Sequence, residues 1–582
     1  MMQAQLAAMM AGRQMMPMGM PQYPQMPGMA PQMPAPQPAA PAPAPAATPA
    51  AAPAAAKADK KAEEDGATKK PFGAIARIAL HKDEMSPRMK GRLDALMARY
   101  MARTKKSKEH TQENRSVNAD PRVVTGFRPA IKELIYPVVI AKSKGSRLWD
   151  LDGNEYVDTL NGFGCNLFGW QPDFVTEAIK HQLDTGHEIG PQTPLAAECA
   201  RLFTEATGHD RAAFCNTGSE AVLGCLRIAR TTTGRPKTAI FTGSYHGIFD
   251  EVIVRATKTK AVPAAPGITP QAAENTIVLD YGTPEAMEVI KKRSNEIAAV
   301  LVEPVQSRRP DFRPREFLHE LRKVTEQSGS LLIFDEVICG FRAGMQGAQG
   351  YFGIKADVAS YGKVVGGGLP IGIMAGKRQY MDALDGGHWQ FGDDSVPTVG
   401  VTYFAGTFVR HPLALSAVKA VLTHLKKEGP GLQKRVDAMT DRLAGEMNAF
   451  FKQVGAPLEI RHFTSLWKTF ATQDNLPWLD LMFVMLRDRG IHILDGFPCF
   501  NTTAHSDADV DLIIKAYKES VAEMQEGGFL PRGEQKVPAV NVFDAQRPPV
   551  PEARLGKDPS GNPAWYVPNP NEPGKYIKLE QA

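Results

Sequence analysis

The sequence predicts an α/β protein, with a mostly parallel sheet in a large domain and a smaller α+β domain after it. Short apolar runs without charge are typical of strands buried on both faces of a sheet. Helical patterns such as Ser219–Arg230 and Arg315–Gln327 lie between these runs, and such alternation indicates parallel strands. The predicted strands are Ala212–Cys215, Thr238–Phe241, Thr276–Leu279, Ala298–Val302 and Leu331–Phe334.

The pattern changes on both sides of this region. After His411, long helices are predicted at Leu413–Lys427 and Leu432–Val454, and a strand-like stretch follows at Leu458–Ala471. This order favours a smaller α+β domain. Before the region, residues 87–104 show an apolar face with helical spacing, made by Leu93, Leu96, Met97 and Tyr100.

The two ends of the chain differ in composition from the middle. Residues 1–57 hold 13 of the 46 prolines and 11 of the 24 methionines with almost no charge, which predicts an extended tether, apart from a short helix that Gln3–Met16 can form. Ten prolines in residues 531–582 favour an irregular arm or a second linker. The predicted parts are a tether at 1–70, a helical segment at 71–125, the large domain at 126–410 (with part of the small domain at its start), the small domain at 411–530 and the arm at 531–582.

Composition argues against several classes of protein. A net charge of +5 over 582 residues is too small to predict nucleic-acid binding. No run of 18 apolar residues predicts a membrane helix, and the N-terminus lacks the pattern of a signal peptide. Six scattered cysteines without a CxxC pair predict reduced thiols, a cytoplasmic location and no metal site. Cys215 and Cys339 lie within or beside apolar strands and are expected to pack in the core.

Five polar motifs lie where strands are predicted to end. Each has an ordinary explanation when taken alone: a helix cap, a surface acid, a solvated loop lysine or a packed aromatic ring. Together they can converge on one crevice at the carboxyl edge of the sheet, where α/β proteins bind ligands. The motifs are Asn216-Thr217-Gly218-Ser219-Glu220, Tyr245-His246-Gly247, Glu303-Pro-Val-Gln306, Asp335-Glu336, and Tyr361-Gly362-Lys363 followed by Val-Val-Gly-Gly-Gly.

These residue types match the needs of pyridoxal phosphate. A lysine forms the imine with its aldehyde. A carboxylate such as Asp335 keeps its pyridine nitrogen protonated. The free N–H groups of a strand-to-helix turn hold its phosphate, and an aromatic ring stacks on its ring.

The combined motifs resemble class III aminotransferases, which are fold-type-I pyridoxal-phosphate enzymes with a seven-stranded sheet, over about residues 120–525. The resemblance rests on NTGSEA (216–221), YHG (245–247), EPVQ (303–306), FDEVICGFR (334–342), YGKVVGGGLPIG (361–372) and FAGTF (404–408). Within this class the chain is similar to glutamate-1-semialdehyde aminomutase. It is more similar to aminotransferase domains of hybrid polyketide–nonribosomal peptide assembly lines, through HEIGPQTPLA (187–196), AFCNTGSEAV (213–222), GSYHGIFDEV (243–252), EPVQSRRPD (303–311) and FAGTFVRHPLAL (404–415).

The resemblance implies roles for the matching residues. Lys363 forms the Schiff base and later moves the proton between substrate and cofactor, and Asp335 pairs with the pyridine nitrogen. Tyr245 stacks on one face of the ring, and Val337 packs on the other. The remaining implied contacts are Gly218 and Ser219 with the phosphate, His246 with the cofactor, Glu303 and Gln306 near the ring oxygen or the substrate, and Thr407 with the phosphate of the neighbouring subunit in a homodimer.

The resemblance also suggests a reaction. The expected enzyme takes an amino group from an amino-acid donor and gives it to a β-ketoacyl chain on an acyl carrier protein. Arg308 and Arg309 can hold a carboxylate or a phosphopantetheine phosphate, or form a solvated basic turn, and Gln192 and Arg410-His411 are similar candidates. The alternatives are a 2,1-aminomutase of the glutamate-1-semialdehyde type, an aminotransferase of free ω-amino acids, or a non-catalytic scaffold.

Overall fold

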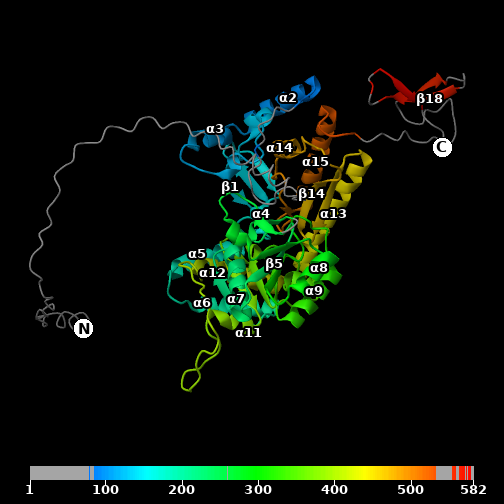
Figure 1. Ribbon diagram of the computed structural model, residues 1–582. Helices are drawn as coiled ribbons and strands as arrows, with labels where there is room; N and C mark the ends of the chain where they lie inside the picture. The colour runs from blue at the N-terminus through cyan, green and yellow to red at the C-terminus, as the bar shows by residue number, and fades with distance from the viewer. Residues whose placement is uncertain are drawn as a thin grey trace, which may run out of the picture. The chain divides into compact units, whose positions relative to one another are not determined.

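The computed structural model describes residues 84–257 and 260–532, residue 78, and short C-terminal stretches at 553–558, 563–569, 572 and 574–578. The tether predicted at 1–70 and the helix considered at Gln3–Met16 lie outside the described residues. Figure 1 shows the elements in chain order. Within the described part of the chain, no helix has the length and apolar character that crossing a bilayer requires.

A seven-stranded sheet forms the centre of the large α/β part, in the order β4-β12-β11-β10-β9-β5-β8. Its neighbours pair in parallel except at β12, which runs antiparallel to β11 and β4. The predicted fold class is confirmed, and all five predicted strands are present. The strands are β4 (Arg211–Cys215), β5 (Lys237–Phe241), β8 (Thr276–Leu279), β9 (Ile297–Val302), β10 (Leu331–Asp335), β11 (Val358–Gly362) and β12 (Gly372–Gly376).

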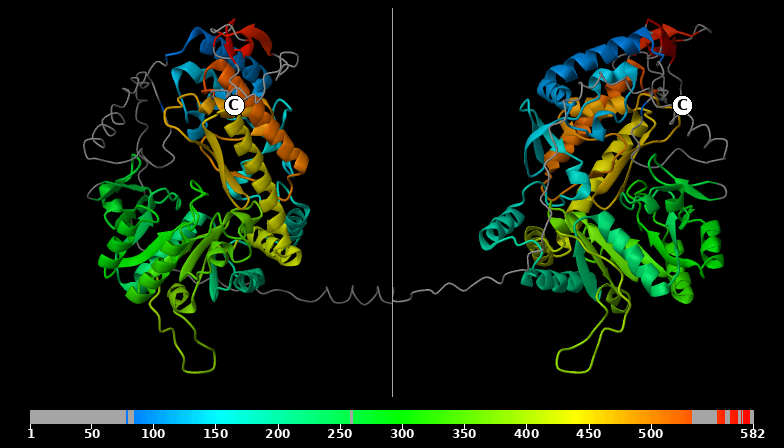
Figure 2. Two further views of the ribbon diagram at one scale, coloured as in Figure 1. Left: turned by 90° about the vertical axis from the view of Figure 1, so that its right-hand side faces the viewer. Right: turned by 60° about the vertical axis from the view of Figure 1, so that its left-hand side comes forward.

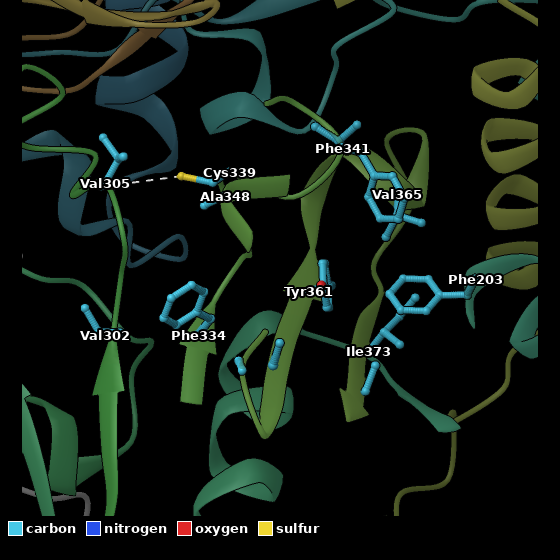
Figure 3. Close-up of a cluster of buried hydrophobic side chains, with 14 of the residues drawn as sticks. Phe203, Val302, Val305, Phe334, Cys339, Phe341, Ala348, Tyr361, Val365 and Ile373 are labelled. Carbon is cyan, nitrogen blue, oxygen red and sulfur yellow. Dashed lines mark hydrogen bonds between the residues drawn. The ribbon is translucent and has the colours of Figure 1, made fainter. Parts of the chain in front are cut away.

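Both faces of the sheet are buried, as the charge-free strands predict. Leu332 and Phe334 belong to one hydrophobic cluster, and Leu331 and Ile333 to another on the opposite face, because successive strand side chains alternate. In Figure 3, side chains of neighbouring strands and of α6 meet in the first cluster. Helix α7 (Gly218–Thr233) contributes to the second cluster. Helices that contribute to the first include α5 (Asp173–Thr185), α6 (Pro194–Thr207), α8 (Pro284–Lys292), α9 (Arg315–Ser328) and α12 (Pro412–Glu428).

A separate hydrophobic core joins the helix predicted at 87–104 with residues 443–530. That helix is confirmed as α2 (Pro87–Arg103), whose Leu93, Leu96 and Tyr100 are buried. The described residues of both cores nevertheless belong to one compact unit by their contacts, so the predicted boundary at 410–411 stays a prediction. The other helices of this core are α13 (Gly431–Gln453), α14 (Asp480–Asp488) and α15 (Asp507–Gly527).

The structure corrects two predictions that were drawn from the sequence pattern. The single strand expected at Leu458–Ala471 is a hairpin, because the chain reverses at Thr464, whose φ is 50°. The irregular C-terminal arm contains a three-stranded sheet around the aromatic pair Trp565 and Tyr566. The strands are β13 (Leu458–Phe463) and β14 (Leu466–Ala471) in the hairpin, and β17 (Arg554–Lys557), β18 (Pro563–Pro568) and β19 (Tyr576–Lys578) in the arm.

All six cysteines are free, and Cys215 and Cys339 are buried as expected.

Most of the remaining elements are short. Between the 3-10 helix η6 (Asp382–Leu384) and α12, a loop extends past the neighbouring helices (Figure 2). The other strands are β1 (Ile140–Lys144), β2 (Arg147–Asp150), β3 (Glu155–Asp158), β6 (Val254–Ala256), β7 (Ala261–Pro263), β15 (Ile491–His492) and β16 (Cys499–Phe500). The other helices are α3 (Lys105–Asn114), α4 (Asn161–Gly164), α10 (Gly347–Phe352), α11 (Arg378–Met381) and the 3-10 turns η1 (Pro121–Val123), η2 (Pro129–Leu134), η3 (Asp250–Val252), η4 (Pro270–Ala273) and η5 (Lys363–Gly366).

Candidate active site

The polar motifs meet at the carboxyl edge of the main sheet. Val302 on β9 pairs with Phe334 on β10, so the following residues, Glu303 and Asp335, come off adjacent strands. Lys363 follows β11, a strand that the sequence pattern did not predict, whereas the predicted strand β8 ends without one of the motifs. The site therefore forms at the ends of β4, β5, β9, β10 and β11, where parallel sheets hold ligands.

Asp335 is the most firmly held acid of the site. It is 4% exposed, and its Oδ1 accepts hydrogen bonds from the Val337 N–H at 3.1 Å and from Ser360 Oγ at 3.2 Å. Its Oδ2 lies 2.7 Å from His246 Nδ1. Nε2 of His246 is buried and has no hydrogen-bond partner among the described residues. The carboxylate is thus fixed in place and still has room for another donor.

Lys363 differs from the two acids at this edge, Asp335 and Glu303, in its backbone conformation and in the contacts of its charged group. It begins η5 with a φ of 48°, a left-handed conformation that non-glycine residues rarely adopt. No hydrogen bond or ion pair to its Nζ occurs within residues 84–257 and 260–532. Burial lowers the pKa of its ammonium group, although the negative charges of Asp335 and Glu303 act in the opposite direction. A partly buried lysine with a lowered pKa is the form of the residue that reacts with carbonyl groups.

Glu303 and Gln306 are two further buried polar side chains of the site. Glu303 accepts the Ser307 N–H at 2.8 Å, and burial together with the nearby Asp335 charge raises its pKa. The Gln306 amide donates to Thr242 O at 3.0 Å and to Ser244 Oγ at 2.9 Å. In the part of the chain that the structure describes, its Oε1 is buried without a partner, so one acceptor of these two side chains remains free.

The strand-to-helix turn after β4 leaves N–H groups available. Thr217 caps α7, and the Glu220 carboxylate turns back to accept the N–H groups of Asn216 and Thr217 at 2.6 and 3.1 Å. No acceptor among the described residues takes the N–H groups of Gly218 and Ser219. Free N–H groups at a helix N-terminus bind anions.

Two glycines bring other segments against this turn. A Cβ on Gly247 would lie 2.5 Å from Ser219 Oγ, and a Cβ on Gly218 would lie 3.0 Å from both methyl groups of Val337. The Tyr245-His246-Gly247 motif and the segment after Asp335 therefore reach the N-terminus of α7. Tyr245 is 44% exposed, so its ring is open to a ligand.

The remaining predicted residues lie outside this cluster or at its margin. Arg308 acts electrostatically on Tyr245, while the Arg309 guanidinium stacks on Phe312 at 4.3 Å. Gln192 is exposed in the loop between α5 and α6. Thr407 is exposed in a turn, next to Gly406, where a Cβ would lie 3.6 Å from Asn216 Nδ2.

Sequence reasoning missed several residues of the site. Ser360, Ser244 and Ser307 bind its polar groups, but single serines carry no pattern. The FDEVICGFR motif contains Arg342 but suggests no role for it, although an arginine at the end of the apolar run Val337–Phe341 is unusual in composition.

A family model described as Aminotransferase class-III matches residues 130–495. The chain belongs to the class-III aminotransferase family. A glutamate-1-semialdehyde 2,1-aminomutase from Desulfitobacterium hafniense (strain Y51) is 35% identical over 406 residues, which cover 66% of this chain and 90% of the relative.

Two solved structures support the same fold. A transaminase with PLP bound is 27% identical with a TM-score of 0.65, and the match covers 73% of this chain and 99% of that chain. A β-phenylalanine aminotransferase from Variovorax paradoxus is 25% identical with a TM-score of 0.65, covering 77% and 100%.

The site of this class-III aminotransferase fits pyridoxal phosphate, the cofactor of its family. The free N–H groups beside Gly218 suit a phosphate, and the buried carboxylate of Asp335 suits a protonated ring nitrogen. Lys363 supplies an amine without a partner. The unpartnered His246 Nε2 and Gln306 Oε1 are buried polar atoms that a bound ligand can satisfy.

Proposed function

We propose that the chain moves an amino group at a carbon distal from the carboxylate of a small free substrate, either between two molecules or within one. The first case is an ω- or β-amino-acid aminotransferase, and the second is a 2,1-aminomutase. The single observation that carries the chemistry is the unpartnered, partly buried amine of Lys363 at the same sheet edge as Asp335. Two of the relatives reported above are named for small molecules, glutamate-1-semialdehyde and β-phenylalanine, which favours this proposal over the carrier-bound β-ketoacyl chain expected from the sequence.

In this proposal several residues bind the cofactor, and one residue, Lys363, acts as the base. The N–H groups of Gly218 and Ser219 hold the phosphate, Asp335 holds the ring nitrogen, and His246 orients the Asp335 carboxylate. When bound, pyridoxal phosphate supplies an aldehyde for the amino group and a ring that spreads the electrons released at the substrate carbon. Lys363 Nζ takes and returns the proton at that carbon.

The other predicted contacts surround the ring and the substrate. Tyr245 and Val337 cover the two ring faces, and Glu303 and Gln306 bind the ring oxygen or the substrate. The electrostatic effect of Arg308 on Tyr245 supports a role for Arg308 in binding a substrate carboxylate. In this proposal Arg309 and Gln192 contact the substrate farther from the ring.

We also propose that the enzyme is a homodimer in which Thr407 of one copy reaches the phosphate of the other. The loop between η6 and α12 exposes large apolar side chains, and exposed apolar patches mark interfaces. They include Trp389, Phe391, Val401, Tyr403 and Phe408. Light scattering of the double variant Phe391→Asp/Tyr403→Asp should give a monomer that binds pyridoxal phosphate more weakly than the native dimer.

A substrate panel separates the possible reactions. The enzyme is offered glutamate-1-semialdehyde alone, ω- and β-amino acids with a keto-acid acceptor, and a β-ketoacyl carrier protein with an amino donor, and the amine products are identified by mass spectrometry. Lys363→Ala should abolish every product, and the surface control Lys419→Ala should not. Turnover of the carrier-bound substrate alone would overturn the proposal. Absence of visible absorbance from bound cofactor, even after adding pyridoxal phosphate, would support a scaffold.

A further inference from the structure

A strained turn lies close to the site without belonging to any of the predicted motifs. Residues Asn161, Gly162, Phe163 and Gly164 have φ values of 47°, 61°, 57° and 89°. Four successive left-handed residues are rare, and two of these carry side chains for which that region is unfavourable. Strain of this kind persists only where the surroundings hold it, and it concentrates at functional sites.

One set of contacts holds the start of the turn. The buried Asp158 carboxylate accepts the N–H groups of Leu160 at 2.9 Å and Asn161 at 3.1 Å. The Asn161 amide donates to the carbonyl oxygens of Asp158 and Phe500, both at 2.8 Å.

Arg342 holds the end of the turn. Its Nη2 donates to Gly164 O, its Nη1 to Ser465 Oγ at 2.8 Å and its Nε to Ile338 O at 3.2 Å. Its guanidinium lies 4.6 Å from the centre of the Phe500 ring. One side chain therefore ties the turn to the β13–β14 hairpin and to β16.

The environment of Arg342 is unusual for a charged residue. It is 1% exposed, and no carboxylate of the described residues lies within ion-pair distance of it. Asp437 acts on it electrostatically without forming an ion pair. A buried cation without a paired anion is costly, so packing alone does not explain an arginine here.

The residues that directly follow the turn approach Lys363 and its loop. A Cβ on Gly368, in the loop after Lys363, would lie 3.0 Å from Asn166 Oδ1. Cys165 and Arg342 are both close enough to act electrostatically on Lys363. On the same turn, the Phe163 ring meets the Phe497 ring edge-on at 5.4 Å, and the two residues remain 38% and 40% exposed. The exposed aromatic pair thus involves the turn whose next residues, Cys165 and Asn166, approach Lys363 and the loop after it.

We propose that Arg342 is a positioning residue: it fixes the Asn161–Gly164 turn so that Phe163 stands against Phe497 as an apolar wall for the non-reacting end of the substrate. The inference rests on the proposed function for the reaction and adds the substrate class. The preferred amine carries an aryl or bulky alkyl group, which contacts the two rings.

Hydrogen exchange tests the positioning role without any substrate. Arg342→Lys keeps the charge but lacks the planar fork that reaches three acceptors. Amides of residues 158–166 should exchange about tenfold faster or more in this variant. The matched control is Arg322→Lys, because Arg322 is also mostly buried but pairs with Asp357 at 2.8 Å; it should leave that segment unchanged. Native-like exchange in Arg342→Lys would overturn the proposal.

Kinetics with two amino donors test the wall. β-Phenylalanine and β-alanine differ by the phenyl ring, so Arg342→Lys should raise KM for β-phenylalanine about tenfold or more while KM for β-alanine and both kcat values stay within about threefold. Phe163→Ala should do the same. In the double variant the two changes should not add, because Arg342 acts through Phe163.

The outcomes separate the two proposals. Equal losses for both amines, or losses that add in the double variant, would overturn the role of the aromatic wall. A wild-type enzyme that uses neither amine and no other free substrate of the panel would contradict the proposed function, while the exchange measurement still decides whether Arg342 holds the turn.

Discussion

Two buried aspartate–histidine pairs lie in the described part of this chain, and they differ in which of their polar atoms have hydrogen-bond partners. Asp335 and His246 are joined at 2.7 Å, and Asp158 and His492 at 2.8 Å, each through Nδ1 of the histidine. The two aspartates are 4% and 1% exposed. Distance and burial alone therefore do not distinguish one pair from the other.

The difference lies in the remaining contacts. Asp158 accepts three further hydrogen bonds, from the Trp170 indole at 2.9 Å and from the backbone N–H groups of Leu160 and Asn161. His492 keeps part of its surface exposed. At the other pair, His246 Nε2 is buried without a partner among the described residues, whereas no buried atom of Asp158 or His492 lacks one there. Since buried polar groups are normally satisfied, the second pair leaves an atom for a ligand.

Asp158→Asn should give the largest effect. It removes the charge from a buried pair and weakens the contacts of the turn, which we expect to lower the free energy of unfolding by about 3–5 kcal/mol. Urea unfolding measures this loss. Asp441 pairs with His462 at 2.7 Å on the surface, so the control Asp441→Asn should cost less than about 1 kcal/mol. Equal losses in the two variants would remove the structural role given to Asp158.

Asp335→Asn should act on the reaction rather than on the fold. Loss of the charge facing the ring nitrogen should lower kcat by about 10²–10³-fold, with a smaller loss of stability than Asp158→Asn causes. Single-turnover absorbance and urea unfolding of the same preparation measure the two quantities. If Asp335→Asn unfolds as readily as Asp158→Asn and keeps its activity, the contrast between the pairs is wrong.

The sequence predicts the position of Asp335 better than it predicts the Asp158–His492 pair. Asp335 follows the apolar run Leu331–Phe334 directly, so its place at a sheet edge was predictable from local pattern. Asp158 and His492 are 334 residues apart, and no local pattern joins them. The same holds for Arg342, whose partners Gly164 and Ser465 come from distant segments.

Strand prediction failed where local composition was ambiguous. The charge-free runs gave five strands of the main sheet, but β11 reads VASYG and β12 reads GIMAG. Small residues and glycine are unfavourable in strands by intrinsic preference. Tertiary burial between neighbouring strands overrides that preference here, and Lys363 is placed by a strand that sequence pattern alone does not reveal.

The smallest expected effect is a change in the free energy of unfolding on acid titration. It tests how much the charge of Asp158 stabilises the Asp158–His492 pair. Burial alone would raise the pKa of Asp158, but the His492 charge and the hydrogen bonds from His492, Trp170 and Leu160 together lower it. A carboxyl group whose pKa is lower in the folded state contributes stability above its unfolded pKa of about 3.9, and that contribution is lost as the pH falls through the folded value. The free energy of unfolding should therefore differ between the native chain and Asp158→Asn by a constant amount from pH 6 to pH 5, and the difference should shrink below about pH 4. A difference that stays constant down to pH 3 would mean that the loss in the variant comes from altered hydrogen-bond geometry and not from the missing charge.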